Sequence, residues 1–208
     1  MIDKAIILAA GYAKRLYPLT ENFPKPLIEI EKNKPVINYI LEKIENTKEI
    51  NTVYVVTNNK YYKHFKNWKN NLKTSLNIEI INDLTNSEEA KLGAVGDINF
   101  VINKKQIQEP ILIIGGDNLF EFELKPMLNY FKKINKDLTT LSEEKNIERL
   151  KKLNSIKIDE NNKIIFFEEK PLKPISILYG NCIYIYKKET LQLIKQFLEH
   201  GNNPDQPG

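Results

Sequence analysis

The sequence predicts an α/β fold in which a mixed, mostly parallel sheet is covered by helices. Short apolar runs alternate with amphipathic segments of helical periodicity through the first half of the chain, which is the pattern of a parallel sheet with helical crossovers. The run IILAA at residues 6–10 is apolar at every position, as expected for a strand buried on both faces. Strands then crowd together after residue 138, which favours an added strand-rich segment and a mixed sheet.

The expected strands are short apolar runs at residues 5–10, 52–57, 77–81, 111–114, 138–141, 155–158, 164–167 and 177–186. The expected helices, in which apolar residues recur every three or four positions, are 35–46, 60–71, 89–103, 125–134 and 189–199. Pro35 suits a first helical turn, where its missing N–H removes no hydrogen bond. The second helix has an apolar face made of Tyr61, Phe65, Trp68 and Leu72. Its lysines therefore form the solvent-facing side and do not indicate nucleic-acid binding.

Composition and charge narrow the class of protein further. With 208 residues, 41% of them hydrophobic, the chain can form its own core, and a single domain over residues 1–208 is expected. The 31 basic and 27 acidic residues are scattered along the chain, and the net charge of +4 argues against a nucleic-acid partner. Cys182 is the only cysteine, which excludes an intrachain disulfide and a cysteine-rich zinc site. No apolar run approaches about 18 residues and no secretory signal is recognised, so a cytoplasmic protein with no membrane partner is expected.

The segment AIILAAGYAKRLYPLTENFPKPLIEI, residues 5–30, leads from the first strand into a loop of small, basic and proline residues. Ligands of open α/β sheets bind outside the carboxyl ends of the strands. Gly11 lies at such an end, and because it has no Cβ the backbone can approach a ligand closely. Arg15 carries a fork of donors that matches a phosphate group, and Lys25 carries a mobile positive charge. The pattern predicts an anionic ligand such as a triphosphate.

Two other phosphate-binding motifs are absent from the sequence. The dinucleotide fingerprint G-x-G-x-x-G fails because Ala13 and Leu16 stand at its later glycine positions, and the Walker pattern G-x-x-x-x-G-K-[ST] occurs nowhere. From spacing alone, a simple strand-to-loop turn with solvated Arg15 and Lys25 remains the alternative interpretation.

The same segment, from LAAG to the end of KPLIEI, resembles the signature of the sugar-nucleotide pyrophosphorylases, above all the glucose-1-phosphate thymidylyltransferase branch. Three further blocks follow in the order that the family has: KLGAVGDI at 91–98, IIGGDNLF at 113–120 and FEEKP at 167–171. The resemblance implies a three-layer α/β/α, Rossmann-like nucleotide-diphospho-sugar transferase fold with a mixed, mostly parallel central sheet.

The resemblance also implies a role for particular residues. The nucleotide would be bound by Leu8, Ala10, Gly11, Leu92, Gly93 and Asn118. Asp117 would ligate Mg²⁺, since a cation that bridges phosphates needs only one or two carboxylates from the protein. Glu169 would accept hydrogen bonds from sugar hydroxyls, and Lys170 would bind the sugar phosphate. The catalytic set implied by the family is Arg15, Lys25, Asp117 and Lys170.

The activity implied by the family is condensation of a nucleoside triphosphate with a sugar 1-phosphate, which yields an NDP-sugar and pyrophosphate. dTTP or UTP is the nucleotide that the resemblance favours, and self-association is expected because family members often form homo-oligomers. Two alternatives stay open: a cytidylyltransferase that acts on a small phosphorylated alcohol such as phosphocholine, and a degenerate nucleotide-binding regulatory domain.

The sequence departs from the family pattern in two regions. Leu153–Asn154 stands where the family has Tyr-Gly, and Asn181–Cys182 stands where it has Thr-Gly, so the sugar pocket is expected to differ. The sequence also stops at Gly208, before the strand and the Asp-Ile-Gly segment that carries a second metal-binding aspartate in the family. The second metal ligand is therefore not assigned, and Asp205 is left without a role.

Overall fold

The computed structural model describes residues 1–205, which fall into two compact units. Of the described residues, the first unit comprises 1–138 and 184–205, and the second comprises Thr139–Ile183. The strand β10 (Leu178–Tyr186) runs from the second unit into the first. Two units that are each defined by their internal contacts can belong to one domain, so the single domain expected over residues 1–208 stays a prediction.

Four parallel strands form the sheet of the first unit in the order β5, β4, β1 and β6. They are β1 (Lys4–Leu8), β4 (Thr52–Thr57), β5 (Asn77–Asn82) and β6 (Ile111–Gly115). Each is rich in either isoleucine or valine, and Ile6, Val55 and Ile113 have no exposed surface. A strand buried on both faces reads as a continuous apolar run, so the parallel sheet predicted from the sequence is confirmed.

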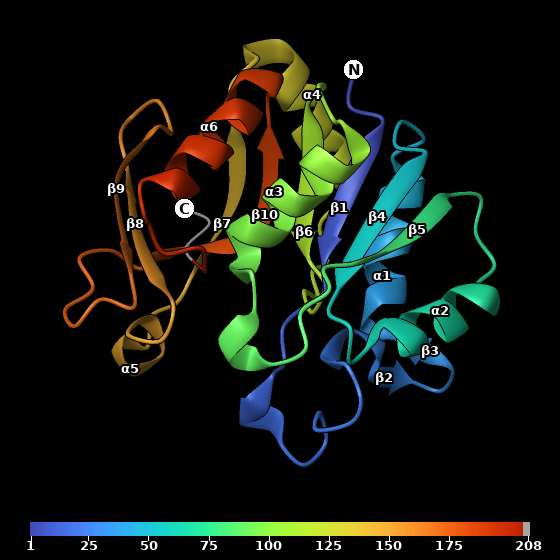
Figure 1. Ribbon diagram of the computed structural model, residues 1–208. Helices are drawn as coiled ribbons and strands as arrows, with labels where there is room; N and C mark the ends of the chain where they lie inside the picture. Colours follow the sequence, from blue (N-terminus) through green and yellow to red (C-terminus); the bar gives the residue numbers. More distant parts are fainter. Residues whose placement is uncertain (206–208) are drawn as a thin grey trace. The chain divides into compact units, whose positions relative to one another are not determined.

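Helices cover both faces of these strands. On one face α3 (Gly93–Lys105) packs against α6 (Lys188–Glu199), and α3 also contacts β1 and β4. The helix α1 (Val36–Asn46) packs against α4 (Leu124–Ile134). Figure 1 shows α3 and α6 in front of the strands and α1 behind them. α2 (Tyr62–Asn70) contacts the edge strand β5. This layering matches the α/β/α arrangement that the sequence predicted.

The second unit is built from antiparallel strands. β8 (Asn154–Ile158) pairs with β9 (Ile164–Glu169), and the pairing aligns Asn154 with Glu169. β8 also pairs antiparallel with β10 through Leu178 and Ile156, and β7 (Leu138–Glu143) pairs with β10. The short helix α5 (Ile147–Leu150) follows β7. The chain therefore combines parallel and antiparallel pairing, as a mixed sheet requires.

Element boundaries differ from the sequence-based expectation in two informative places. The segment expected as one helix from residue 89 is a 3₁₀ turn, Glu88–Ala90, followed by α3, because Gly93 takes a φ of +76° that a continuous helix does not allow. The sequence also did not predict the hairpin of β2 (Glu29–Glu31) and β3 (Lys34–Pro35). Pro35 lies just before α1 and not in its first turn.

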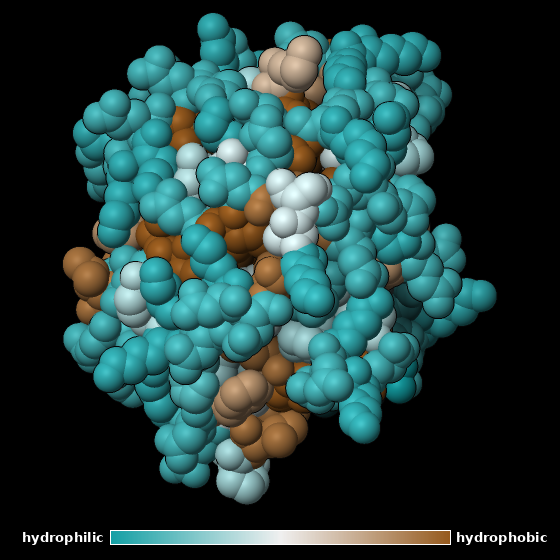
Figure 2. Space-filling model, turned by 90° about the vertical axis from the view of Figure 1, so that its right-hand side faces the viewer, coloured by the Kyte–Doolittle hydropathy of each residue, from teal (hydrophilic) through white to brown (hydrophobic). Residues whose placement is uncertain are grey.

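The side of the molecule that lies at the right of Figure 1 is mainly hydrophilic, with scattered hydrophobic patches (Figure 2). Among residues 1–205, no helix combines the length and the apolar character that crossing a membrane requires.

Candidate functional site

A cavity of about 480 Å³ lies in the first unit, where β1 and β6 end. The loop after β1, the 3₁₀ turn at Lys25–Leu27, the start of α3 and Asp117, two residues after β6, all contribute to it. The side chains or backbone of the following residues line it: Leu8, Ala9, Ala10, Gly11, Tyr12, Ala13, Lys14, Arg15, Leu16, Lys25, Pro26, Glu88, Lys91, Gly93, Ala94, Asp97, Asp117 and Asp205. This is the position at which open α/β sheets bind ligands.

Most of the residues predicted for a nucleotide site meet in this cavity. The ones that line it are Leu8, Ala10, Gly11, Arg15, Lys25, Gly93 and Asp117. Leu92 and Asn118 are sequence neighbours of lining residues but do not line the cavity themselves. Glu169 and Lys170 belong to the second unit. A Cβ built on Gly11 would meet nothing within 4 Å, so the backbone there is open to a ligand.

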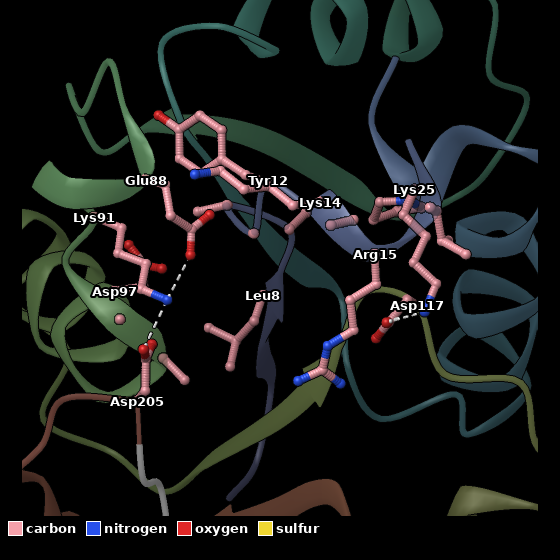
Figure 3. A pocket seen from close by; sticks show the side chains of 18 residues that line it. Leu8, Tyr12, Lys14, Arg15, Lys25, Glu88, Lys91, Asp97, Asp117 and Asp205 are labelled. Atoms are coloured by element: carbon pink, nitrogen blue, oxygen red, sulfur yellow. Dashed lines mark hydrogen bonds and ion pairs between the residues drawn. The ribbon is translucent and has the colours of Figure 1, made fainter. Parts of the chain in front are cut away.

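Arg15 lies in a 3₁₀ turn, Lys14–Leu16. Hydrogen bonds that involve the buried residues Thr20 and Tyr61 hold the start of this turn in place. Ala13 begins the turn in the left-handed region, and its carbonyl oxygen accepts a hydrogen bond from Thr20 Oγ1 at 2.8 Å. The buried Tyr61 donates its hydroxyl to the carbonyl oxygen of Thr20 at 2.8 Å. In Figure 3 the Arg15 guanidinium points into the cavity, and within residues 1–205 it forms no ion pair with another side chain. An anionic ligand could therefore use all of its donors.

Lys25 and Asp117 form an ion pair across the cavity, with 2.6 Å between Nζ and Oδ2 (Figure 3). Their side chains are 39% and 46% exposed, so the pair contributes little to stability and its partners can be exchanged for a ligand. Gly116 sets the position of Asp117, because its N–H donates to the Leu8 carbonyl oxygen at 2.7 Å. A Cβ on Gly116 would lie 2.7 Å from that same oxygen, which only glycine avoids.

The donor chemistry at Asp117 fits a hard divalent cation. Residues 1–205 contain no cluster of three or more histidine, cysteine, aspartate or glutamate side chains that could hold a metal ion alone. Mg²⁺ does not need one, since it keeps several waters and binds through one or two carboxylates together with substrate phosphates. A half-exposed carboxylate facing a basic loop meets that requirement.

A second set of charged residues, which the sequence did not single out, surrounds the start of α3. Lys91 forms ion pairs with Glu88 and with Asp205, each at 2.8 Å (Figure 3). The Val95 N–H donates to the carbonyl oxygen of Pro204 at 2.8 Å. We call Glu88, Lys91, Pro204 and Asp205 the α3 rim. Nothing in the spacing of these residues indicates that they meet, because the chain brings the last two from beyond α6.

Gly93→Ala is expected to disturb this rim and to lower the free energy of unfolding. A Cβ at Gly93 would lie 2.7 Å from two backbone atoms of Pro204, and its φ of +76° adds strain. Gly201→Ala is the matched control, because Gly201 has a φ of +73° but open space around its missing Cβ. In urea unfolding we expect Gly93→Ala to cost at least about 1 kcal/mol more than Gly201→Ala. Equal costs would mean that the contact with Pro204 does not exist in solution.

Asp97 is the most unusual group in the cavity. It is 6% exposed, and Asp83, which follows β5, is 4% exposed. Asp83 Oδ1 accepts hydrogen bonds from the N–H and the hydroxyl of Thr85 at 2.7 and 2.8 Å. In the described part of the chain, Asp83 Oδ2 and Asp97 Oδ1 receive no hydrogen bond. Burial, together with the negative charge of Asp83, raises the pKa of Asp97 to about 8. One carboxyl of the pair is thus protonated at neutral pH and can donate to the other.

Glu169 is the last residue of β9 in the second unit, and Lys170 follows it directly. Lys170 takes a φ of 47°, and its N–H donates to the Leu153 carbonyl oxygen at 2.7 Å. Burial raises the pKa of the Glu169 carboxyl, whereas the charge of Lys170 lowers it. Cys182 has a φ of 56°, a conformation that favours glycine, at the position where the resembling family has glycine. The backbone at Cys182 therefore has the conformation that a glycine would favour, although the residue carries a side chain.

Fold and cavity together define an α/β protein with basic and acidic side chains gathered at the carboxyl edge of its parallel strands. The model of the nucleotidyl transferase family matches residues 4–206, and the chain belongs to this family. The match confirms the resemblance to the sugar-nucleotide pyrophosphorylases that the sequence motifs indicated.

Two relatives show how much of their sequence this chain shares. The chain is 32% identical over 192 residues to the bifunctional protein GlmU of Methanocaldococcus jannaschii, a match that covers 92% of this chain and 42% of the relative. It is 30% identical over 194 residues to a putative mannose-1-phosphate guanyltransferase of Sulfolobus acidocaldarius, covering 91% of this chain and 50% of the relative. The chain therefore spans half or less of the length of these relatives.

A solved structure shares the fold. The structure of a putative glucose-1-phosphate thymidylyltransferase from Bacillus anthracis superimposes with a TM-score of 0.79 at 22% identity. The superposition covers 93% of this chain and 74% of the other. It confirms the Rossmann-like α/β fold with a mixed, mostly parallel sheet.

Proposed function

We propose that this chain transfers a nucleotidyl group from a nucleoside triphosphate to a sugar 1-phosphate and releases pyrophosphate. The observation that carries the proposal is the Arg15 guanidinium, which forms no ion pair within residues 1–205 and points into a cavity at the carboxyl edge of a parallel sheet. The exchangeable Lys25–Asp117 pair lines the same cavity. Membership of the nucleotidyl transferase family supports the reaction class.

The reaction needs little from the protein beyond positioning and charge. An oxygen of the sugar phosphate attacks the α-phosphorus, a new P–O bond forms, and the bond to the bridging oxygen of the β-phosphate breaks. Pyrophosphate leaves with the electron pair. The attacking group is already an anion, so no general base and no covalent enzyme intermediate are required. Arg15 and Lys25 lower the repulsion between two polyanions that must meet in line.

Asp117 is the residue that would hold Mg²⁺ in this proposal. When bound, the ion supplies positive charge next to the phosphate groups of the substrate. Release of Asp117 from Lys25 would at the same time free the lysine ammonium for a phosphate oxygen, since the two side chains pair with each other at 2.6 Å.

The sugar phosphate is assigned to the second unit on the strength of the family resemblance. Glu169 would accept hydrogen bonds from sugar hydroxyls, and the ammonium of Lys170 would bind the phosphate. The left-handed backbone at Lys170, directly after β9, fixes the direction in which that side chain leaves the main chain. Cys182 carries a side chain at a position where the family has glycine, so we expect the sugar pocket to differ from that of the family.

dTTP or UTP is the nucleotide that we propose. The names of similar proteins include both a guanyltransferase and a thymidylyltransferase. Gly93 and Ala94 present backbone and small side chains at the start of α3, which suits contact with a flat base.

A substrate panel with product identification by mass tests the proposal. Purified chain is incubated with Mg²⁺, each of the nucleoside triphosphates, and either sugar 1-phosphates or phosphocholine, while pyrophosphate release is followed. We expect an NDP-sugar, formed with dTTP or UTP. For the variant Asp117→Asn we expect this reaction to be slower by at least about 10²-fold, as for the loss of other groups that stabilise charge in the transition state. Product with phosphocholine and CTP alone would identify a cytidylyltransferase instead. Nucleotide binding without turnover would identify a regulatory domain.

A further inference from the structure

A second cavity, of about 510 Å³, lies in the first unit between α2 and the β2–β3 hairpin. Figure 1 shows α2 beside this hairpin. His64, Asn67, Trp68 and Asn71 are spaced by three and four residues, so one face of α2 and its C-terminal end forms one wall. The nucleotide-site residues described above are absent from this wall and from the rest of the lining.

The lining combines an aromatic ring with side-chain amides. Trp68 is half-buried, and its indole N–H donates to Asn38 Oδ1 at 2.9 Å, which fixes the orientation of the ring. Asn38, Asn33 and Asn67 also line the cavity, and in residues 1–205 the side chains of Asn33 and Asn67 make no hydrogen bond with another residue. Each amide offers both donors and an acceptor, which is what a hydroxyl group, itself donor and acceptor, requires.

The charges of the two cavities differ. Among the described residues, no lysine or arginine lines the second cavity, and its one ionisable acid is Glu29. The first cavity is lined by four cationic residues, Lys14, Arg15, Lys25 and Lys91. A phosphate group would find neither a lysine nor an arginine in the described lining of the second cavity, and it would face a carboxylate. A neutral ligand rich in hydroxyl groups, with an apolar face for Trp68, fits this lining.

We propose that the cavity between α2 and the β2–β3 hairpin binds a neutral sugar. The C–H face of the sugar ring lies against Trp68, and its hydroxyl groups exchange hydrogen bonds with the amides of Asn33 and Asn67 and with Glu29. Because its described lining shares no residue with the first cavity, this site is distinct from the proposed nucleotide site. A neutral sugar held there would be an effector or a second carbohydrate ligand of the same chain.

Trp68 is the only tryptophan of the chain, so tryptophan fluorescence reports on this cavity. The purified chain is titrated with glucose, mannose, galactose and N-acetylglucosamine, without nucleotide or metal. We expect a saturable change in Trp68 emission for at least one of them, with a Kd of about 1–10 mM, as for a small ligand in an open site. Glucose 1-phosphate, titrated in parallel, is expected to bind more weakly than the neutral sugar.

Two variants on the same helix separate this site from other causes of a fluorescence change. Asn67→Ala removes a lining amide and is expected to weaken binding about threefold to tenfold, as for loss of one hydrogen bond. Asn70→Ala is the matched control, because Asn70 is exposed on α2 but does not line the cavity. An unchanged emission with all four sugars, an equal response in both variants, or tighter binding of the sugar phosphate would each overturn the proposal.

Discussion

Replacing Arg15 with alanine is expected to lower kcat/KM for sugar-nucleotide formation by at least about 10²-fold, since arginines that stabilise transferring phosphoryl groups are worth about 10³–10⁵ in rate. The physical reason is the position of the guanidinium. It points into the cavity and is not paired with a carboxylate of the described chain, so its charge and its donors are available to the triphosphate. Initial rates at several triphosphate concentrations provide the measurement.

Two further variants sharpen this test. Arg15→Lys keeps the charge but loses the planar fork of donors, so we expect it to recover only part of the rate. Arg149→Ala is the matched control, because Arg149 is the other arginine of the chain, is 74% exposed and pairs with Glu144 at 3.5 Å. A loss of less than about threefold in correctly folded Arg15→Ala would show that the guanidinium is not used, because even one neutral hydrogen bond is worth about that much.

The buried Asp83–Asp97 pair is expected to make the protein less stable as the pH rises. Burial holds the pKa of Asp97 at about 8 in the folded chain, against 3.8 for an ordinary aspartate. Between these values the folded state binds more protons than the unfolded state, so the free energy of unfolding falls as the pH rises from about 4 to about 8. The slope for one proton is at most about 1.4 kcal/mol per pH unit.

Asp97→Asn removes this dependence while keeping the shape of the side chain. The amide can donate to Asp83, which then ionises with a partner, in place of two carboxyls that compete for one proton. In urea unfolding at pH 5 and pH 8, we expect the wild type to lose at least about 1 kcal/mol more than Asp97→Asn between the two pH values. Glu160→Gln, at an exposed position, serves as control. An identical loss in wild type and Asp97→Asn would show that the pair ionises freely when folded.

Elements with a strong apolar signal could be predicted from the sequence. β4 is observed with the expected bounds, because TVYVVT is an uninterrupted run of β-branched and aromatic residues that is buried in the sheet. The hairpin of β2 and β3 could not be found in this way. Its strands, EIE and KP, have only three and two residues, and Glu29, Ile30 and Glu31 are exposed. Neither strand therefore shows the alternation of apolar and polar residues by which a half-buried strand is predicted.

In the candidate site, too, some residues could be predicted from local sequence patterns and others could not. Arg15, Lys25 and Asp117 follow strands or a glycine turn within compact motifs, and these motifs carried the prediction. Asp97 gave no signal, because its environment depends on Asp83 at the end of a different strand. Only tertiary packing brings the two carboxyls together. Local patterns therefore predict the residues that a loop presents to a ligand but not the groups that packing places behind them.

The hydrogen bond from Val95 to Pro204 joins two regions that are distant in the chain and have separate elements of structure. Proteins open in cooperative segments, and the segments nearest to a ligand site are usually the least stable. An amide proton exchanges with solvent only when its hydrogen bond breaks. The Val95 amide therefore reports, through its exchange rate with deuterium, how often the cavity wall at α3 comes apart while the parallel strands stay paired.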